Sequence, residues 1–515
     1  MIQCVNFQKF EHWKLNIGNC DMTDRQKYRL LEILPGTLTW TTILGAVALS
    51  LIKPLWAIYF IIVFDLYWLF RVSYFVLWLT ISWFYYRKES RIDWYARVQE
   101  LPGWKNIWHL IFLPTHQDEI EVLESTFEAL SKSKYPHDRM MVVLAGEERD
   151  EERFRRIERD IRSRYAGQFA HFFITLHPDN LPAEIKGKGS NLNWSGKKIK
   201  QEIDRLQIPY DKIIVSAFDI DTVVHPQYFA RLAHAFLTSP KPLRTSYQPL
   251  AIYNNNVWET PSFSRIVANS TTFWLMTELA RPERLLTFSS HSMSWQALVD
   301  VGFWQKDVVN EDARISMQCI VRYHGDYRIA PLYVPVSMDT CYGGGFWRTV
   351  KNQYRQMQRW AWSVEHIPYL ATNFTRDPLM PHGIKLRYLW LLIEGTYTWA
   401  TASVLIFILG WFPLFVASYR DASSLLVQNA PFVLENLMRS AMIGIIMSAL
   451  VNASLAPPHP RRKLIKFAIM IGQWALLPMT LILFGSLPAI DSQTRLMMGK
   501  YLGFWTTEKV RKSKI

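Results

Sequence analysis

The sequence predicts an α/β domain embedded between transmembrane α-helices. Half of the 515 residues are apolar, and these residues gather before residue 87 and after residue 386. The long segment between them alternates short apolar runs with charged, helix-like stretches. Runs of about 20 apolar residues indicate membrane spans, whereas short alternating segments indicate a soluble domain. The hydrophobic pattern therefore divides this chain better than its length does.

The N-terminal part of the chain predicts a membrane hairpin. Residues 1–36 lack the apolar core of a signal peptide and are expected to form a cytosolic or interfacial segment. Residues 37–86 are almost uninterruptedly apolar, which is too long for one span of about 20 residues. We expect two transmembrane legs that turn near Lys53. Asp65 and Arg71 in the second leg are costly in lipid, so they should face protein or each other.

The C-terminal membrane region is predicted over residues 387–490. Its apolar runs lie at 388–418, 434–455 and 464–487, which brings the total to about five spans. An odd total would place the basic tail, residues 491–515, outside the cell, against the cytoplasmic preference of Lys and Arg. Either one run is interfacial or re-entrant, or the first of the three runs contains two short legs.

The formal charge of +14 limits the classes of partner. Nucleic-acid binding would need a basic stripe interleaved with aromatic residues, and the sequence has none. Basic residues instead flank the apolar runs, at 87–91 and in the loop 459–466. This predicts an integral membrane protein, of a bacterial inner or plasma membrane, whose middle domain is cytoplasmic. The cysteines lack metal-ligand spacing and are expected to be free thiols: Cys4, Cys20, Cys319 and Cys341.

Residues 87–340 predict a parallel sheet with helices on both faces. Strand-like runs are "IWHLIFLPT", "MMVVLAG", "HFFITL" and "KIIVSAF". Between them lie the helical segments "DEIEVLESTFEALSKS" and "EERDEERFRRIERDIRSRY", and then a polar loop followed by a helix through "NWSGKKIKQEI". Strands separated by helices favour a parallel sheet, which binds ligands beyond the carboxyl ends of its strands.

The first candidate site is "FDID", residues 218–221, which follows the strand "KIIVSAF". Asp219 and Asp221 are two residues apart, and on an extended chain this spacing places both carboxylates on one face. Hard oxygen ligands suit Mg²⁺ or Mn²⁺ bridging a diphosphate. A solvated turn is the plain alternative, and the preceding apolar strand favours the metal site.

The second candidate is "NEDARIS", residues 310–316, which predicts the start of a helix. Acidic residues stabilise a helix N-terminus through its dipole, and this alone would explain Glu311 and Asp312. Their place after the Asp219–Asp221 pair also suits a general base for an acceptor hydroxyl.

Two further segments could contact an anionic or sugar ligand. "KGKGSNLNW", residues 186–194, offers polar side chains before a helix, although a plain loop is as good an explanation. Residues 341–386 are expected to form interface helices. In a helix over 346–365, Gln356 would share a face with Arg359 and Trp360, because they are three and four residues apart. Arg donates to phosphate and Trp stacks on sugars, but the same residues also anchor helices at lipid headgroups.

In order along the chain, "PTHQD", "KGSNLN", "FDID", "NED" and "QMQRW" resemble the motifs of the membrane-bound family-2 glycosyltransferases, the branch with cellulose and hyaluronan synthases. The resemblance covers roughly residues 105–365 and the flanking membrane layout. Any one match is weak, but five in order at similar spacing are specific. The resemblance implies a GT-A-like, Rossmann-related α/β domain.

The resemblance also implies a role for each matched residue. Asp219 and Asp221 match the DxD that holds the nucleoside diphosphate with a divalent metal, Mg²⁺ or Mn²⁺. Asp312, beside Glu311, matches the general base of the E-D pair. The remaining matches are contacts to the donor or acceptor: Thr115, Asp118, Lys188, Asn193, Gln356, Arg359 and Trp360.

The function implied is inverting, metal-dependent transfer of a sugar from a nucleotide-sugar donor to a growing polysaccharide at the cytoplasmic membrane face. A membrane-lipid acceptor is the alternative. Two departures matter: Glu147 and Glu148 follow the second strand later than the family's acidic pair, and the chain has fewer spans than polymer-translocating synthases. A glycosidase with the same carboxylates, or a non-catalytic membrane scaffold, fits the motif set less well.

Overall fold

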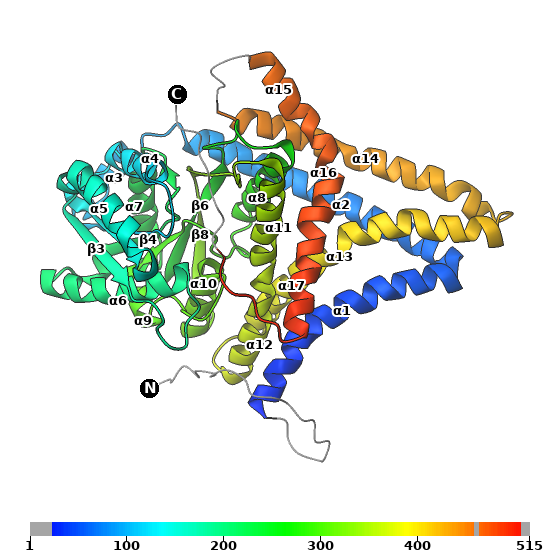
Figure 1. Cartoon of the computed structure of the whole chain (residues 1–515), viewed down its shortest axis with the longest axis horizontal. Helices are drawn as coiled ribbons and strands as arrows, with labels where there is room; N and C mark the ends of the chain where they lie inside the picture. Colours follow the sequence, from blue (N-terminus) through cyan, green and yellow to red (C-terminus); the bar gives the residue numbers. More distant parts are fainter. Residues whose placement is uncertain (1–22, 458–462, 506–515) are drawn as a thin grey trace.

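The computed structural model describes residues 23–457 and 463–505. Its centre is an α/β domain around one mixed sheet, and long apolar helices extend from one side of this domain (Figure 1). The N-terminal residues 1–22, the first half of the basic loop 459–466 and the tail from residue 506 lie outside the described part. Expectations for those segments, including Cys4 and Cys20, stay predictions. Cys319 and Cys341 are buried and are not joined to each other by a disulfide.

The sheet has eight strands in the order β3-β2-β1-β4-β7-β6-β8-β5. Neighbouring strands β3, β2, β1 and β4 are parallel, as are β6 and β8. The strands are β1 Trp108–Pro114, β2 Met140–Glu147, β3 His171–His177, β4 Ile213–Ala217, β5 Val223–Val224, β6 Thr245–Tyr253, β7 Ser292–Ser294 and β8 Arg328–Met338.

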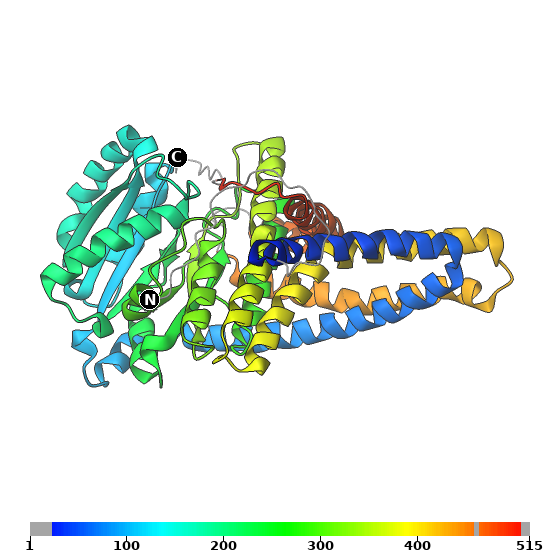
Figure 2. The ribbon, with the colours of Figure 1, turned by 90° about the horizontal axis from the view of Figure 1, so that it is seen from below.

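The four predicted strands are β1 to β4. Every residue of β2 is buried, and because alternate side chains point to opposite faces, the sheet must be covered on both. Figure 2 shows helices on either side of it. These four strands are parallel as predicted, but the sheet as a whole is mixed, because β7 runs antiparallel to both β4 and β6. Strand β7 has only three residues, two of them serine, so the sequence contains no apolar run that would predict it.

Helices of the domain connect these strands. They are α3 Trp94–Gln99, α4 Ile120–Ser131, α5 Glu151–Tyr165, α6 Lys188–Leu206, α7 Tyr228–Thr238, α8 Ser262–Leu279, α9 Trp295–Asp300 and α10 Glu311–Arg322. Helix α6 begins earlier than expected, so that the polar stretch before Trp194 forms its first turns. The amide of Asn191 donates to the carbonyl of Gly187 at 3.1 Å, and Ser190 Oγ accepts from the Gly187 amide at 3.2 Å. These bonds satisfy the free groups of the first turn.

The apolar helices of the described chain are α1 Asp24–Ile52, α2 Pro54–Glu89, α13 His382–Arg420 and α14 Leu425–Leu455, followed by α15 Lys463–Gly472, α16 Leu477–Thr480 and α17 Leu487–Met497. Five stretches are long and apolar enough to cross a membrane, the fifth being 468–497. The first two helices meet at Lys53, where Pro54 suits the first helical position. Because α13 is one unbroken helix, the run 388–418 does not contain two legs.

Two shorter helices, α11 Phe346–Ala361 and α12 His366–Arg376, lie between the sheet and the long helices (Figure 1). Helix α11 contains the predicted helical stretch with Gln356, and residues 362–365 continue it as a tighter 3-10 turn. The polar residues Asp65 and Arg71 do not pair with each other. Arg71 instead binds Glu394 of α13, with 2.7 Å between Nη2 and Oε1, and Asp65 is buried.

Candidate active site

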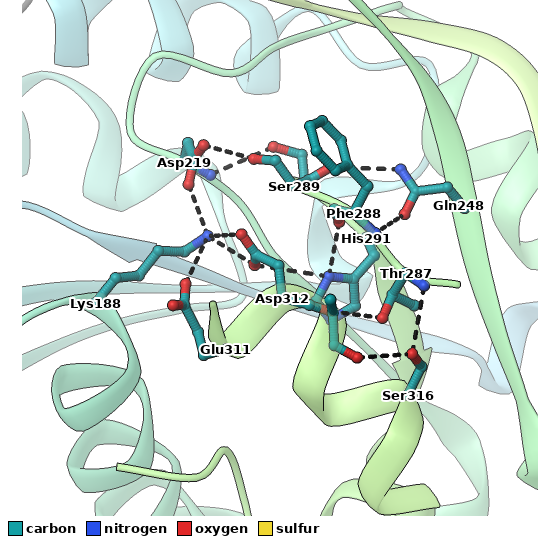
Figure 3. Close-up of polar contacts among 12 residues, drawn as sticks. Lys188, Asp219, Gln248, Thr287, Phe288, Ser289, His291, Glu311, Asp312 and Ser316 are labelled. Carbon is teal, nitrogen blue, oxygen red and sulfur yellow. Dashed lines mark hydrogen bonds and ion pairs between the residues drawn. The ribbon is translucent and has the colours of Figure 1, made fainter. Parts of the chain in front are cut away.

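One lysine ammonium lies at the centre of the carboxylates that the sequence singled out (Figure 3). Lys188 is the first residue of α6, Asp219 follows β4, and Glu311 and Asp312 begin α10. Lys188 Nζ lies 2.6 Å from Asp219 Oδ1, 2.8 Å from Asp312 Oδ1 and 3.4 Å from Glu311 Oε1. The fold thus brings together three segments that are far apart in sequence.

The electrostatics of this cluster favour positively charged ligands. Burial by itself lowers the pKa of Lys188, but the carboxylates of Asp219 and Asp312 outweigh it and raise this pKa well above its usual value. Burial, and then the charge of Asp312, raise the pKa of Glu311 to about 7. Carboxylates outnumber cationic groups here, so a further cation would be stabilised.

The two aspartates of "FDID" have different surroundings. The Asp219 side chain is 27% exposed and accepts a hydrogen bond from Ser289 Oγ. Asp221 is fully buried, and its Oδ2 accepts from the amide of Asp339 at 2.7 Å. Residues 219–222 form a turn, since the Thr222 amide donates to the Asp219 carbonyl at 3.0 Å. The expectation of an extended chain with both carboxylates on one face is therefore wrong, and Asp219 is the accessible one.

The loop before β7 supports the carboxylates, although no motif in the sequence pointed to it. Thr287 Oγ1 donates to the main-chain carbonyl of Asp312, and Ser289 binds Asp219. His291 Nδ1 lies 3.8 Å from Asp312 Oδ1 and 3.1 Å from the carbonyl of Phe288. Burial lowers the pKa of His291, which favours its neutral form beside the acidic cluster. The signal available was "TFSSHS", a run of small polar residues directly before a short strand.

The ends of β1 and β2 carry a second group of polar residues. Thr115 Oγ1 donates to Asp118 Oδ2 at 3.0 Å, and the amide of His116 donates to the same oxygen at 3.0 Å. Glu147 ends β2, is buried and binds Arg149 Nε at 2.5 Å. These residues line the carboxyl edge of parallel strands, where ligands of such sheets bind.

Asn193 is placed differently from the other matched residues. It is buried in α6, and its Nδ2 donates to the carbonyl of Trp304 at 2.6 Å. This bond holds α6 against the segment before α10. Asn193 therefore helps to position the two helices that contain Lys188 and Asp312.

Helix α11 brings an aromatic side chain to the same loop. The Trp360 ring lies 6.0 Å from that of Phe288 and 6.2 Å from that of Tyr253, measured between centroids. Gln356 Oε1 accepts from Gln353 Nε2 at 3.1 Å. Asn310, which precedes α10, donates from Nδ2 to the carbonyl of Arg359 at 3.0 Å. The α11 and α10 segments are thereby linked at the cluster.

The segment after α17 returns to the site. The guanidinium of Arg359 lies 5.1 Å from the centre of the Phe504 ring, and that of Arg355 lies 5.4 Å from the Trp505 ring. A Cβ built on Gly187 would lie 2.4 Å from Phe504 Cγ, so the ring packs directly on this glycine. Phe504 therefore joins the start of α6 to the end of α11, which no motif predicted.

The residues present fit a divalent cation held jointly with an anionic ligand. Within 23–457 and 463–505, no three His, Cys, Asp or Glu side chains form a ready-made metal cage. Asp219 nevertheless offers an accessible hard oxygen, and the acidic cluster already surrounds one cation, the Lys188 ammonium. Mg²⁺ is typically held by one or two carboxylates and substrate phosphates, so an incomplete protein cage is the usual arrangement.

Residues 214–455 match the family model described as "Glycosyl transferase family group 2". This segment, a little under half of the chain, is similar to the glycosyltransferases of family 2. The protein is therefore an enzyme, a glycosyltransferase, and its mixed sheet with flanking apolar helices agrees with the expected GT-A-like class embedded among membrane helices. The match contains Asp219, Asp312 and Trp360.

Solved structures provide two comparisons. The mannosyltransferase PcManGT from Pyrobaculum calidifontis, in complex with GDP-Man and Mn²⁺, is 14% identical with a TM-score of 0.39, covering 73% of this chain and 99% of that one. TarS 1–349 of S. aureus, in complex with UDP-GlcNAc, is 12% identical with a TM-score of 0.34, covering 77% of this chain and 93% of that one. A search of curated proteins found no match.

Proposed function

We propose that the glycosyltransferase domain inverts the anomeric centre of a nucleotide-sugar donor, with a divalent metal, and extends a growing polysaccharide at the cytoplasmic membrane face. One observation carries the proposal. The Lys188 ammonium lies 2.6 Å from Asp219 Oδ1 and 2.8 Å from Asp312 Oδ1, so a base and a diphosphate anchor flank the same point. Transfer needs this closeness, because the attacked carbon lies between the acceptor oxygen and the diphosphate.

The residues divide the chemistry between them. Asp312 accepts the proton of the acceptor hydroxyl, whose oxygen forms a bond to the anomeric carbon from the face opposite the diphosphate. The bond from that carbon to the diphosphate oxygen breaks, and the electron pair leaves with the nucleoside diphosphate. Lys188 and Arg359 stabilise the charge on this leaving group. A divalent ion held by Asp219, with Asp221 behind it, would neutralise further diphosphate charge.

The edge formed by β1 and β2 is the proposed place of the nucleotide. Thr115 and Asp118 follow β1. Glu147 ends β2 and Arg149 follows it, which offers a carboxylate acceptor beside a guanidinium donor. Trp360 and Phe288 would stack on the acceptor sugar next to Asp312. Gln356 lies on the same helix as Trp360, and its hydrogen bond from Gln353 would help to keep this helix in place.

A lipid acceptor is the second candidate, and one observation favours it. Beneath Trp360 the space towards the long helices is filled by Val267, Met357 and Phe484, an apolar cluster from three segments. A polysaccharide that passed from Trp360 into the long helices would have to displace this apolar cluster. A lipid-linked acceptor that reaches the site from the membrane surface would not need such a passage.

Replacing Asp312 with Asn tests the proposal. Purified protein in lipid is supplied with Mn²⁺ and a panel of radiolabelled nucleotide sugars, and labelled product is followed in the aqueous and organic phases. The variant should lose transfer by about 100-fold or more, because the general base is missing. Donor binding should be preserved.

The matched control is Asp326→Asn, because the Asp326 side chain is 39% exposed and binds Lys241 and Arg244 away from the cluster. Equal activity of the Asp312 and control variants would refute the assignment. Label in a long water-soluble polymer supports the polysaccharide acceptor, and label in the organic phase supports the lipid acceptor.

A further inference from the structure

The fifth apolar stretch, residues 468–497, differs in direction from the other four. It contains the end of α15, a 3-10 turn, α16, a π-helical turn over 481–486, and α17. In Figure 1 it runs across α1, α2, α13 and α14, and in Figure 2 the red α17 is seen nearly end-on while those helices lie in the plane of the view. Hydropathy alone would count it as a span.

The beginning of this stretch contacts α8, a helix of the transferase domain. Gln473 Oε1 accepts from Arg265 Nε at 2.8 Å. The Trp474 ring stacks on Phe273, with 5.5 Å between centroids and 12° between planes. Helix α8 itself packs on the sheet, since Thr272 Oγ1 donates to the carbonyl of Ala251 in β6.

The end of the stretch contacts α11 on the same domain. Ser492 Oγ donates to the carbonyl of Gln358 at 2.8 Å, and Asp491 accepts from the side chain of Gln358. Helices α8 and α11 are themselves joined, because Ser264 Oγ donates to Gln353 Oε1 at 2.9 Å. Both ends of the stretch therefore meet the transferase domain.

This placement is incompatible with a membrane crossing. Gln473 and Ser492 are separated by a length of helix that covers nearly 30 Å, about the thickness of the hydrocarbon core. A crossing helix would put these two residues at opposite membrane surfaces, and only one of them could then touch the transferase domain. After α17 the chain reaches Phe504, which packs on Gly187 of that domain.

We infer that residues 468–497 lie along the membrane surface as an interfacial helix, and that its exposed apolar side binds the boundary between lipid headgroups and acyl chains. The helices that cross are then α1, α2, α13 and α14 among the described residues. The number of crossings is even, and the chain at Phe504 is on the same side as the transferase domain.

The exposed side chains of the stretch suit this lipid partner. They are large and apolar: Ile469, Ile471, Leu476, Met479, Leu481 and Leu487. Because both ends of the stretch are held on one domain, these side chains can enter the boundary between headgroups and acyl chains only with the helix lying along the surface. Other side chains of the stretch contact protein: besides the bonds to α8 and α11, Gln493 binds Thr39 of α1 and Ser486 binds the Trp399 carbonyl of α13.

Depth-dependent quenching tests the inference on the full chain. With all four cysteines replaced by alanine, Met479→Cys carries a bimane label in vesicles that contain lipids spin-labelled either near the headgroup or deep in the acyl chain. Met479 is 59% exposed. The matched control is Ile443→Cys in the middle of α14, which is 62% exposed.

Shallow spin labels should quench the label at 479 more than deep ones, and the ratio should be reversed at 443. Stronger deep quenching at both positions would show that the fifth stretch crosses the membrane. Lack of quenching by either lipid at 479, with normal quenching at 443, would show that protein covers this face, for example a second copy of the chain. Either result overturns the inference, whereas the proposed sugar transfer is measured separately.

Discussion

At the scale of single residues, Gly187 shows how closely the site is packed. The Phe504 ring fills the space that a side chain at residue 187 would need, and the guanidinium of Arg359 lies over the same ring. The backbone of Gly187 is extended, a conformation open to any residue, so the need for glycine is purely steric. Lys188, the next residue, holds the carboxylate cluster together.

Replacing Gly187 with alanine should therefore destabilise the protein by about 1–3 kcal/mol, the usual range for overpacking. Phe504→Ala removes the clashing ring, so the double variant should be more stable than the sum of the single effects predicts, with a coupling of at least about 0.5 kcal/mol. Thermal unfolding of the four proteins measures this coupling. Gly167→Ala is the control, because a Cβ there meets nothing within 4 Å. Strict additivity would show that Phe504 does not rest on Gly187 in solution.

At the scale of elements, a buried polar group links α10 to the turn before α12. Arg314 of α10 donates from Nε to His366 Nδ1 at 3.1 Å and lies 3.9 Å from the centre of the Tyr369 ring. Beside it, Glu365 accepts from Trp362 Nε1 at 2.8 Å. Burial raises the pKa of Glu365 to about 7, and the nearby Arg314 charge opposes this rise only in part. Glu365 also accepts from the amide of Val309, just before α10. The start of the helix that contains Asp312 therefore contacts a carboxyl group whose pKa is about 7.

The sign of the resulting pH dependence follows from this shift. The pKa of Glu365 rises from 4.5 to about 7 on folding, so the fold favours the protonated acid. Stability should fall as the pH rises from about 4.5 to about 7, and this contribution should level off above. In Glu365→Gln the decline should be missing, so the melting temperature of the variant relative to the wild type should increase over that range. Glu202→Gln, on the outer side of α6, is the control, and a constant difference for Glu365→Gln would contradict the argument.

The elements differ in how far the sequence could predict them. Strands β1 to β4 are continuous apolar runs, and α10 begins where two acidic residues stabilise a helix start, so local signals were enough. Motifs singled out Asp219, Asp312 and Trp360. They did not show that the two aspartates meet at Lys188 or that Trp360 packs on Phe288, because spacing along a chain does not tell which loops meet. The return of Phe504 depends on the path of 468–497, which hydropathy cannot distinguish from a crossing.

At the scale of the whole molecule, one ion pair joins the two halves of the membrane region. Arg71 of α2 binds Glu394 of α13 at 2.7 Å, and its guanidinium lies 5.8 Å from the centre of the Trp68 ring. Helix α2 leads into the transferase domain and α13 leads out of it. The pair therefore holds α2 and α13, the long helices before and after this domain, next to each other.

Arg71→Leu should destabilise the protein by about 2.5–3.5 kcal/mol, since it leaves Glu394 as an unpaired charge among apolar helices. The double variant Arg71→Leu with Glu394→Leu should regain most of this loss, because no uncompensated charge remains. Thermal unfolding in lipid or detergent measures both. The control is Lys200→Leu, whose partner Asp204 lies one helical turn away on a solvated surface. A double variant as unstable as the single one would show that shape, not charge, holds the two helices together.

The contact between Gly187 and Phe504 also sets an order of events during biosynthesis. The ribosome releases Phe504 more than three hundred residues after Gly187, when all four crossing helices have already left it. The carboxylate cluster can form on the earlier part of the chain, but the contact of Phe504 with Gly187 and Arg359 forms only after α13 and α14 have been made. A nascent chain that has not yet reached Phe504 therefore lacks this contact, and the space beside Gly187 stays unfilled until the long helices have been made.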